Sequence, residues 1–198
     1  MGIAERKVRE KEAVRSLILE ASWEIVQKSG WQALSMRKLA EAIEYSAPVI
    51  YSHFTGKEAI LEEFVRKGFR ELNEALLVVK NRYRDPKEQI DALAAAYLQF
   101  GTMHRQRYEL MYGLGMPSCE KVREIPELSV FTRILLEPIE AMLEDTAHPE
   151  SDPVTKMRAF WSMMHGLVSI SLMDFHSGEA ASRDILKDLV RNFIRGIR

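Results

Sequence analysis

The side chains that could hold a metal ion or act as a nucleophile are few and widely spaced in this chain. His104, His148, His165 and His176 show no i, i+4 pairing, and Cys119 is the only cysteine. A zinc site needs several such ligands close together, and a lone cysteine cannot form a disulfide within the chain. No nucleophile stands in a recognisable pattern with a base. The sequence therefore predicts no metal, no cofactor and no enzymatic activity.

A second kind of chemistry, the reading of DNA bases, is indicated by residues 34–57. An apolar stripe with helical spacing, capped by Ser35, is followed by a short break and by a second helix that opens at Ser46 and Pro48. The stripe consists of Met36, Leu39, Ala40 and Ile43. Two helices joined by a turn of about 3–4 residues form a helix-turn-helix, whose second helix enters the major groove.

Two short motifs in this stretch add a family resemblance. The segment SMRKLA is followed by IYSHF and then by Lys57 and Glu58. This combination resembles the TetR family of transcriptional regulators, over about 50 residues at the N-terminus. Members of that family usually carry Gly-Val in the turn where this chain has Glu44 and Tyr45. A non-glycine residue in a left-handed turn costs about 1–2 kcal/mol, so we expect a slightly rebuilt turn.

The resemblance implies which side chains contact DNA. Arg37 is the best candidate for reading a guanine, and the small apolar residues of the second helix can touch thymine methyl groups. The remaining polar positions are expected to hold phosphates. Tyr51 has a competing interpretation, in which it seals the small core together with Phe54, and Phe54 itself is assigned to the core. The predicted DNA-binding residues are Ser35, Arg37, Ser46, Ala47, Pro48, Val49, Tyr51, Ser52, His53 and Lys57.

A second resemblance concerns the segment FWSMMHGLV, which contains Trp161, His165 and Gly166. It is similar to the Trp/His-Gly segment in the C-terminal domains of one TetR subgroup. Aromatic and methionine residues of the C-terminal region are predicted to line a pocket for a small molecule, and core packing is the competing explanation. The predicted ligand-binding residues are Tyr97, Phe100, Met103, Tyr108, Met111, Tyr112, Phe131, Trp161, Met164 and His165.

The elements that must position these side chains are all helical. Hydrophobic periodicity predicts about nine helices and no strand, with a three-helix DNA-binding domain at residues 1–56 and a ligand-binding and dimerisation domain at residues 57–198. In the first helix the predicted apolar stripe is Val14, Leu17, Ile18, Ala21 and Ile25. Asp85, Asp152 and Ser182 are predicted to cap later helices.

The last two helices, at about residues 153–176 and 182–197, carry apolar residues on more than one side. Such surplus apolar surface on an antiparallel helix pair predicts a four-helix interface between two copies of the chain. TetR-like proteins dimerise in this way, which agrees with the prediction.

Charge and hydropathy bound the setting in which the protein works. The net charge is −1, but residues 1–57 hold nine Lys/Arg against seven Asp/Glu. This asymmetry is weak, so the motif carries the DNA-binding inference. The longest run without formal charge, residues 159–173, spans 15 residues and contains His165. We therefore expect no export signal and no membrane span, and the cytoplasm as the location.

Together these features predict a homodimeric, ligand-responsive transcriptional regulator. The resemblance favours a repressor that a small, largely apolar effector releases from a palindromic operator. The alternative is an all-helical enzyme or a small-molecule-binding protein without DNA binding. A gel-shift on DNA from beside the coding region separates the two, because only the regulator forms a salt-sensitive, sequence-selective complex.

Overall fold

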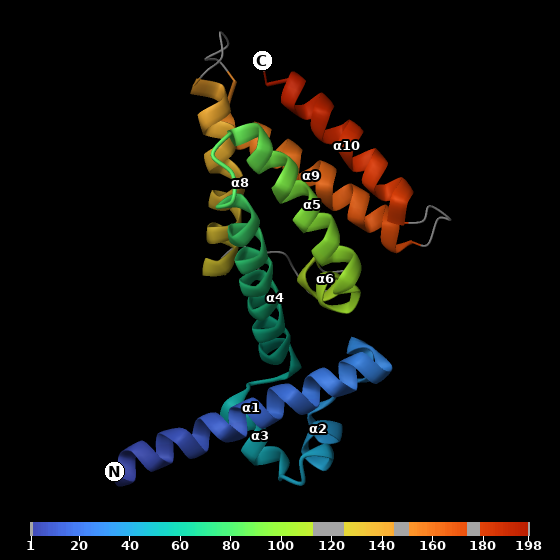
Figure 1. Ribbon diagram of the computed structural model, residues 1–198. Helices are drawn as coiled ribbons and strands as arrows, with labels where there is room; N and C mark the ends of the chain where they lie inside the picture. The colour runs from blue at the N-terminus through green and yellow to red at the C-terminus, as the bar shows by residue number, and fades with distance from the viewer. Residues whose placement is uncertain (1, 113–124, 145–150, 174–178, 198) are drawn as a thin grey trace. The chain divides into compact units, whose positions relative to one another are not determined.

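The computed structural model of this protein describes residues 2–112, 125–144, 151–173 and 179–197. This part of the chain contains nine α-helices and one short 3₁₀ helix and has no β-strand, which confirms the all-α prediction (Figure 1). None of these helices combines the length and the apolar content needed to cross a bilayer. The helices are α1 (Ile3–Ser29), the 3₁₀ helix (Trp31–Ala33), α2 (Met36–Ala42), α3 (Ala47–His53), α4 (Lys57–Lys80), α5 (Pro86–Met103), α6 (Arg105–Met111), α8 (Pro126–Glu144), α9 (Pro153–Leu172) and α10 (Glu179–Arg195).

The chain packs as two compact units, Met1–Phe64 and Val65–Arg198. The division falls within α4, so this helix begins in the first unit and continues into the second. The domain boundary predicted from the sequence lies between residues 56 and 57, where α4 begins, and the division between the two compact units lies further along this helix.

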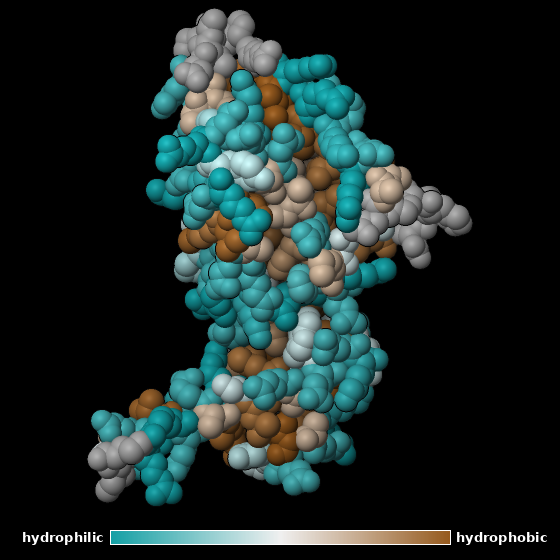
Figure 2. Space-filling view, in the orientation of Figure 1, coloured by the Kyte–Doolittle hydropathy of each residue, from teal (hydrophilic) through white to brown (hydrophobic). Residues whose placement is uncertain are grey.

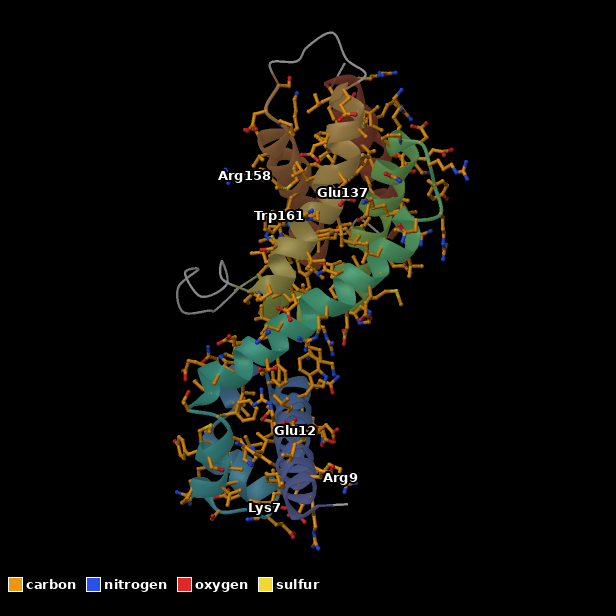
Figure 3. All side chains as sticks on the ribbon, turned by 90° about the vertical axis from the view of Figure 1, so that its left-hand side faces the viewer. Lys7, Arg9, Glu12, Glu137, Arg158 and Trp161 are labelled. Carbon is orange, nitrogen blue, oxygen red and sulfur yellow. The ribbon has the colours of Figure 1, made fainter. Side chains whose placement is uncertain are left out.

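In the N-terminal unit, the buried face of α1 is narrower than the apolar stripe predicted from the sequence. Ile18 and Val26 are buried, and Ser22 is fully buried between them at helical spacing. The Ser22 hydroxyl donates to the Ile18 carbonyl at 2.7 Å, which satisfies the buried polar group. Leu17, which we expected on the buried face, is 38% exposed. Residues 4–13 of α1 are exposed, with Lys7 among their labelled side chains (Figure 3).

The two short helices of the helix-turn-helix close on a small apolar core. Leu39 of α2 and Ile50 of α3 have no exposed surface, and Phe54 is 2% exposed. Arg15 of α1 lies over the Phe54 ring at 4.4 Å from its centroid and pairs with Glu63 of α4 at 2.7 Å. A single cation thus joins three helices of this unit.

The turn between α2 and α3 is a Schellman motif with an unusual residue in its left-handed position. The Tyr45 N–H donates to the Ala40 carbonyl at 3.0 Å, and the Glu44 N–H points at the Glu41 carbonyl at 3.4 Å. Glu44 has a φ of 57°, in the region that glycine adopts without penalty. The predicted departure from the family pattern is therefore accommodated by the same turn geometry, with backbone strain at Glu44.

In the C-terminal unit, two of the three predicted helix caps are confirmed. Asp85 accepts from the Lys87 N–H at 3.0 Å, and Asp152 accepts from the Thr155 N–H at 2.9 Å. The prediction that Ser182 caps the last helix is wrong, because α10 begins earlier and Ser182 lies inside it, 5% exposed. Its hydroxyl forms a hydrogen bond with that of Ser171 on α9 at 3.1 Å. The serine that the sequence suggested as a cap therefore serves as a contact between two helices.

The core of the C-terminal unit lies among α5, α8 and α9, with α10 packed on α5 and α9 (Figure 1). Gly101 of α5 permits this close packing, because a Cβ atom there would lie 2.4 Å from Val168 of α9. The largest fully buried side chains of this unit are aromatic, namely Tyr97, Tyr108, Phe69, Phe131 and Phe160. Aromatic rings, two of them with hydroxyls, therefore fill the space among these helices.

Replacing Glu44 by glycine should raise the free energy of unfolding by about 1 kcal/mol, because glycine adopts the left-handed conformation without the Cβ clash. Chemical denaturation measures the change. Glu44→Ala is the matched control, because it removes the carboxylate but keeps Cβ, and it should give no comparable gain. An equal gain from alanine would show that charge, and not backbone strain, governs this position.

Candidate functional site

The residues predicted to contact DNA all have accessible surface on α2, α3 and the start of α4. None of them is buried, whereas Ile50 and Phe54, which hold α3 on the core, are buried. Ser35 and Arg37 belong to the start of α2, and Lys57 is the first residue of α4. The others form the N-cap and body of α3, namely Ser46, Ala47, Pro48, Val49, Tyr51, Ser52 and His53.

Arg37 is available for an outside partner. Its side chain is 90% exposed, and its Nε pairs with Glu41 Oε1 at 2.9 Å, one turn along α2. An exposed pair of this kind contributes at most about 1 kcal/mol, so a guanine edge can replace it.

The polar residues around α3 differ in how much freedom they keep. The Ser35 hydroxyl already accepts from the Lys38 N–H at 3.2 Å, and Ser52 donates to the Val49 carbonyl at 2.7 Å. Tyr51 is 53% exposed, so it does not seal the core as Phe54 does. The Lys57 ammonium lies 5.7 Å from the centroid of the Trp31 ring, and Lys57 is a half-buried residue at the start of α4.

In the C-terminal unit, six of the ten predicted ligand-binding residues meet in one aromatic cluster. Ring centroids of neighbouring members lie between 4.6 and 6.5 Å apart. The aromatic cluster is made by Tyr97 of α5, Tyr108 of α6, Tyr112 at the end of α6, Phe131 of α8, and Trp161 and His165 of α9. These residues are far apart in sequence and come together only through helix packing.

The aromatic cluster has a closed side and an accessible edge. Tyr97, Tyr108 and Phe131 are at most 1% exposed. Tyr112, Trp161 and His165 are half-buried. Trp161 lies on α9 beside α8, with its ring 5.1 Å from that of Phe131 (Figure 3).

Polar atoms of the aromatic cluster form a continuous hydrogen-bonded chain. The Trp161 indole N–H donates to the Tyr97 hydroxyl at 3.2 Å, and the Tyr97 and Tyr108 hydroxyls lie 3.1 Å apart. The Tyr108 hydroxyl is in turn 2.5 Å from Nδ1 of His165. Four residues on three helices are thereby linked through their polar tips, which offsets the cost of burying them.

Burial keeps all titratable members of the aromatic cluster neutral near pH 7. It raises the pKa of Tyr97 and of Tyr108 well above the ordinary range. Burial also raises the pKa of Tyr112, partly offset by the nearby Tyr97 hydroxyl and Trp161 indole. Burial lowers the pKa of His165, which favours neutral imidazole.

The other four predicted ligand-binding residues lie outside the aromatic cluster. Met111 is buried where α6 meets α4, since a Cβ atom on Gly68 would lie 2.5 Å from its sulfur. The Phe100 ring contacts that of His104 at 5.0 Å. Met164 is buried, and Met103 is 68% exposed.

Met103 instead lines a groove of about 680 Å³ among α5, α9 and α10. The other lining residues are Ala95, Leu98, Gln99, Thr102, Ser171, Ser182, Arg183 and Leu186. The groove and the aromatic cluster share no residue.

Carboxylate-centred contacts between α4 and α8 were missed from the sequence. Glu127 of α8 pairs with Arg70 at 2.8 Å and Arg66 at 3.3 Å, and its backbone carbonyl accepts from Asn73 at 2.8 Å. Burial alone would raise the pKa of Glu127, but its hydrogen bonds and the two arginines lower it. Such pairs have no sequence signal, because about 55 residues separate the partners and any exposed acid would look the same.

Within the described residues, no group of three or more His, Cys, Asp or Glu side chains is placed to hold a metal ion. Cys119, His148 and His176 lie outside the described residues.

The His165 environment predicts a pH-dependent stability. The unfolded chain takes up a proton as the pH falls below about 6.5, whereas burial lowers the folded pKa of His165 and resists this uptake. The stabilisation is complete above pH 6.5 and is lost as the pH falls toward the folded pKa. His165→Asn keeps an acceptor for Tyr108 without this titration and should flatten that part of the curve. Denaturant unfolding across this pH range measures the slope, and identical slopes in both proteins would contradict the assignment.

Comparison with known proteins identifies both units. Residues 18–72 match the model for "Bacterial regulatory proteins, tetR family", and residues 90–193 match "Tetracyclin repressor-like, C-terminal domain". The chain is 23% identical over 187 residues to an uncharacterized HTH-type transcriptional regulator, Rv0681, of Mycobacterium tuberculosis, covering 91% of this chain and 82% of that protein.

Solved structures share the fold over nearly the whole chain. A protein of unknown function from Rhodococcus sp. RHA1 superposes with a TM-score of 0.74 at 24% identity, covering 92% of this chain and 94% of that one. AibR, solved with isovaleryl coenzyme A and operator DNA, has a TM-score of 0.65 at 18% identity, covering 89% of this chain and 95% of its own. The chain belongs to the TetR family of transcriptional regulators, which bind operator DNA as dimers and respond to small-molecule ligands.

Proposed function

We propose that this protein is a homodimeric repressor whose helix-turn-helix, within residues 1–56, reads a palindromic operator and whose residues 57–198 bind the effector and the second copy. The observation that carries the proposal is the accessible face of α3, held on a core by Ile50 and Phe54. The relatives share regulatory names, and we assign no catalytic activity to this chain. Its place of action is then the cytoplasm, where operator DNA lies.

The proposed division of labour on DNA follows side-chain chemistry. Arg37 can donate two hydrogen bonds to guanine O6 and N7, and Ala47, Pro48 and Val49 can contact thymine methyl groups. Hydroxyl, imidazole and ammonium groups at the remaining positions suit phosphates and fix the register. These phosphate contacts are assigned to Ser35, Ser46, Tyr51, Ser52, His53 and Lys57.

We place the effector against the aromatic cluster, because its edge is half-accessible and its walls are apolar rings with few polar atoms. A site of this composition suits a small, largely apolar molecule. AibR, which shares the fold, was solved with an acyl coenzyme A, and an acyl group is likewise mostly apolar. Phe100, Met111 and Met164 would support the site as buried packing around it.

We place the dimer interface on α9 and α10. Ile170 and Met173 at the end of α9 are 55% and 68% exposed, and Ile185 of α10 is 47% exposed. Figure 2 shows hydrophobic surface on the part of the C-terminal unit where α5, α9 and α10 pack together. A second copy would remove these side chains from water, and small residues such as Gly166 would let the helices approach closely.

Helix α4 offers a route from effector to DNA, because it begins at Lys57 and runs into the C-terminal unit. There it is tied to α8 by Glu127 and by the pair between Lys80 and Glu137, and to α6 by the pair between Glu71 and Arg107. An effector that shifts α6 or α8 would pull on α4. Linkage then requires equal coupling, typically about 1–3 kcal/mol, in both directions.

Arg37→Ala should weaken operator binding by about 1–3 kcal/mol and relax the preference at one base position in each half-site. Lys57→Ala should weaken binding to all sequences about equally and reduce its salt dependence. Fluorescence anisotropy on DNA from beside the coding region, with single-base variants, measures both effects. Lys28→Ala, at the far end of α1, is the control for loss of one positive charge. Equal loss of specificity in both variants would show that the roles are wrongly assigned.

The unaltered chain should sediment as a dimer at micromolar concentration, and Ile170→Asp or Ile185→Asp should shift it toward monomer by burying a charge in the apolar interface. Both side chains are exposed in the isolated chain, so the fold should survive, as circular dichroism would show. Val78→Asp, on an α4 residue that is 56% exposed, is the matched control and should stay dimeric. A monodisperse monomer of the unaltered protein would refute the interface.

A further inference from the structure

One polar atom in the aromatic cluster has no partner. The Tyr112 hydroxyl is fully enclosed, and no described residue meets it with hydrogen-bond geometry, although the Tyr97 hydroxyl and the Trp161 indole lie close enough to lower its pKa. The nearest candidates, the Trp161 N–H and the Tyr97 hydroxyl, are bonded to each other at 3.2 Å. An enclosed hydroxyl without a hydrogen-bond partner loses its bonds to water and gains no bond within the protein. It therefore marks a position where a hydrogen-bond partner from outside the chain would be stabilising.

The hydrogen-bonded chain also has a direction. An indole N–H can only donate, so Trp161 donates to Tyr97. Tyr97 can then donate to Tyr108, and Tyr108 to Nδ1 of His165. Since burial favours neutral His165, its proton then lies on Nε2.

Two donors are left over in this arrangement. They are the Tyr112 O–H and the His165 Nε2–H, neither of which donates to a residue in the described part of the chain. The two rings are in contact, with centroids 4.6 Å apart, and both belong to the half-buried edge of the aromatic cluster. Among the residues that the structure describes, this edge therefore offers two hydrogen-bond donors and no acceptor for them.

The charge of the missing acceptor follows from its neighbours. Every described ring in contact with Tyr112 is neutral, namely Phe69, Tyr97, Tyr108, Trp161 and His165. A carboxylate among these neutral rings would lose its hydration and gain no charged ring in return, which costs far more than burying a carbonyl. The flat faces of Trp161 and Tyr112 suit a planar apolar body.

We propose that the edge of the aromatic cluster binds an uncharged, planar apolar molecule bearing a carbonyl oxygen, which accepts a hydrogen bond from Tyr112. His165 Nε2–H is the second donor available to the same oxygen. This assignment rests on the proposed effector site and specifies the chemistry that the site selects.

The test compares three probes of nearly equal size on the free protein, without DNA. Acetophenone has the carbonyl, ethylbenzene has a methylene in its place, and benzoate has a charged carboxylate. Titration calorimetry should show acetophenone binding about tenfold tighter than ethylbenzene, as one hydrogen bond to an otherwise unpaired donor provides. Benzoate should bind more weakly than acetophenone.

Tyr112→Phe removes only the hydroxyl and should abolish the preference for acetophenone while leaving ethylbenzene binding unchanged. Tyr83→Phe, at a tyrosine that is 42% exposed after α4, is the matched control and should keep the preference. The carbonyl ¹³C resonance of labelled acetophenone reports the bond without any variant, because hydrogen-bond donation moves it downfield.

Equal binding of acetophenone and ethylbenzene, tightest binding of benzoate, or no binding of any probe would overturn the proposal. A preference that survives Tyr112→Phe, or an unshifted carbonyl resonance, would mean that a buried water satisfies the hydroxyl and that the acceptor binds elsewhere. Operator release is measured separately on the protein–DNA complex. Its failure would refute the proposed repressor mechanism while leaving the acceptor preference intact.

Discussion

The C-terminal unit depends on how four polar groups are accommodated inside an aromatic core. Placing the Tyr97 and Tyr108 hydroxyls, the His165 imidazole and the Trp161 indole away from water costs several kcal/mol unless they bond to one another. The observed chain of contacts, 2.5 to 3.2 Å long, links α5, α6 and α9 through these atoms. Because each group satisfies the next, displacing any one of these helices leaves a buried donor or acceptor unpaired. The Tyr112 hydroxyl lies beside this network and takes no part in it.

Helix α4 has charged contacts in both units. In the C-terminal unit its charged residues are held by Glu127 and Glu137 of α8 and by Arg107 of α6, and α6 also carries Tyr108. The two helices that hold α4 in this unit, α6 and α8, also carry Tyr108 and Phe131 of the aromatic cluster. In the N-terminal unit the same helix contributes Glu63, which binds the Arg15 side chain that also covers Phe54. In each unit, ion pairs therefore attach the local part of α4 to neighbouring helices.

The helix-turn-helix has buried apolar side chains on its inner side and exposed side chains on its outer side. Ile50 and Phe54 hold α3 on the core, while Arg37 and Tyr51 keep exposed side chains, and the ion pair of Arg37 with Glu41 is itself exposed. Within the described residues, Glu44 is the one non-glycine residue with a left-handed backbone conformation, and it is strained for that reason. The Schellman hydrogen bonds hold that conformation, so the angle between α2 and α3 survives without glycine.

Local patterns in the sequence determined the helices, most of the caps and the accessible face of α3, because helical periodicity and capping act over three or four residues. They also identified the aromatic residues of the C-terminal region but could not separate Tyr112, whose hydroxyl lacks a partner, from Met103, which lies on a different groove. The sequence pattern assigned Ser182 to a helix cap, although it is buried inside α10 with a hydrogen bond to Ser171 that a polarity pattern does not register. Which rings meet, which hydroxyl is left unpaired and which acid clamps α4 were decided only by the tertiary structure. Those features depend on contacts between residues about ten to sixty-five positions apart, and no local preference encodes such distances.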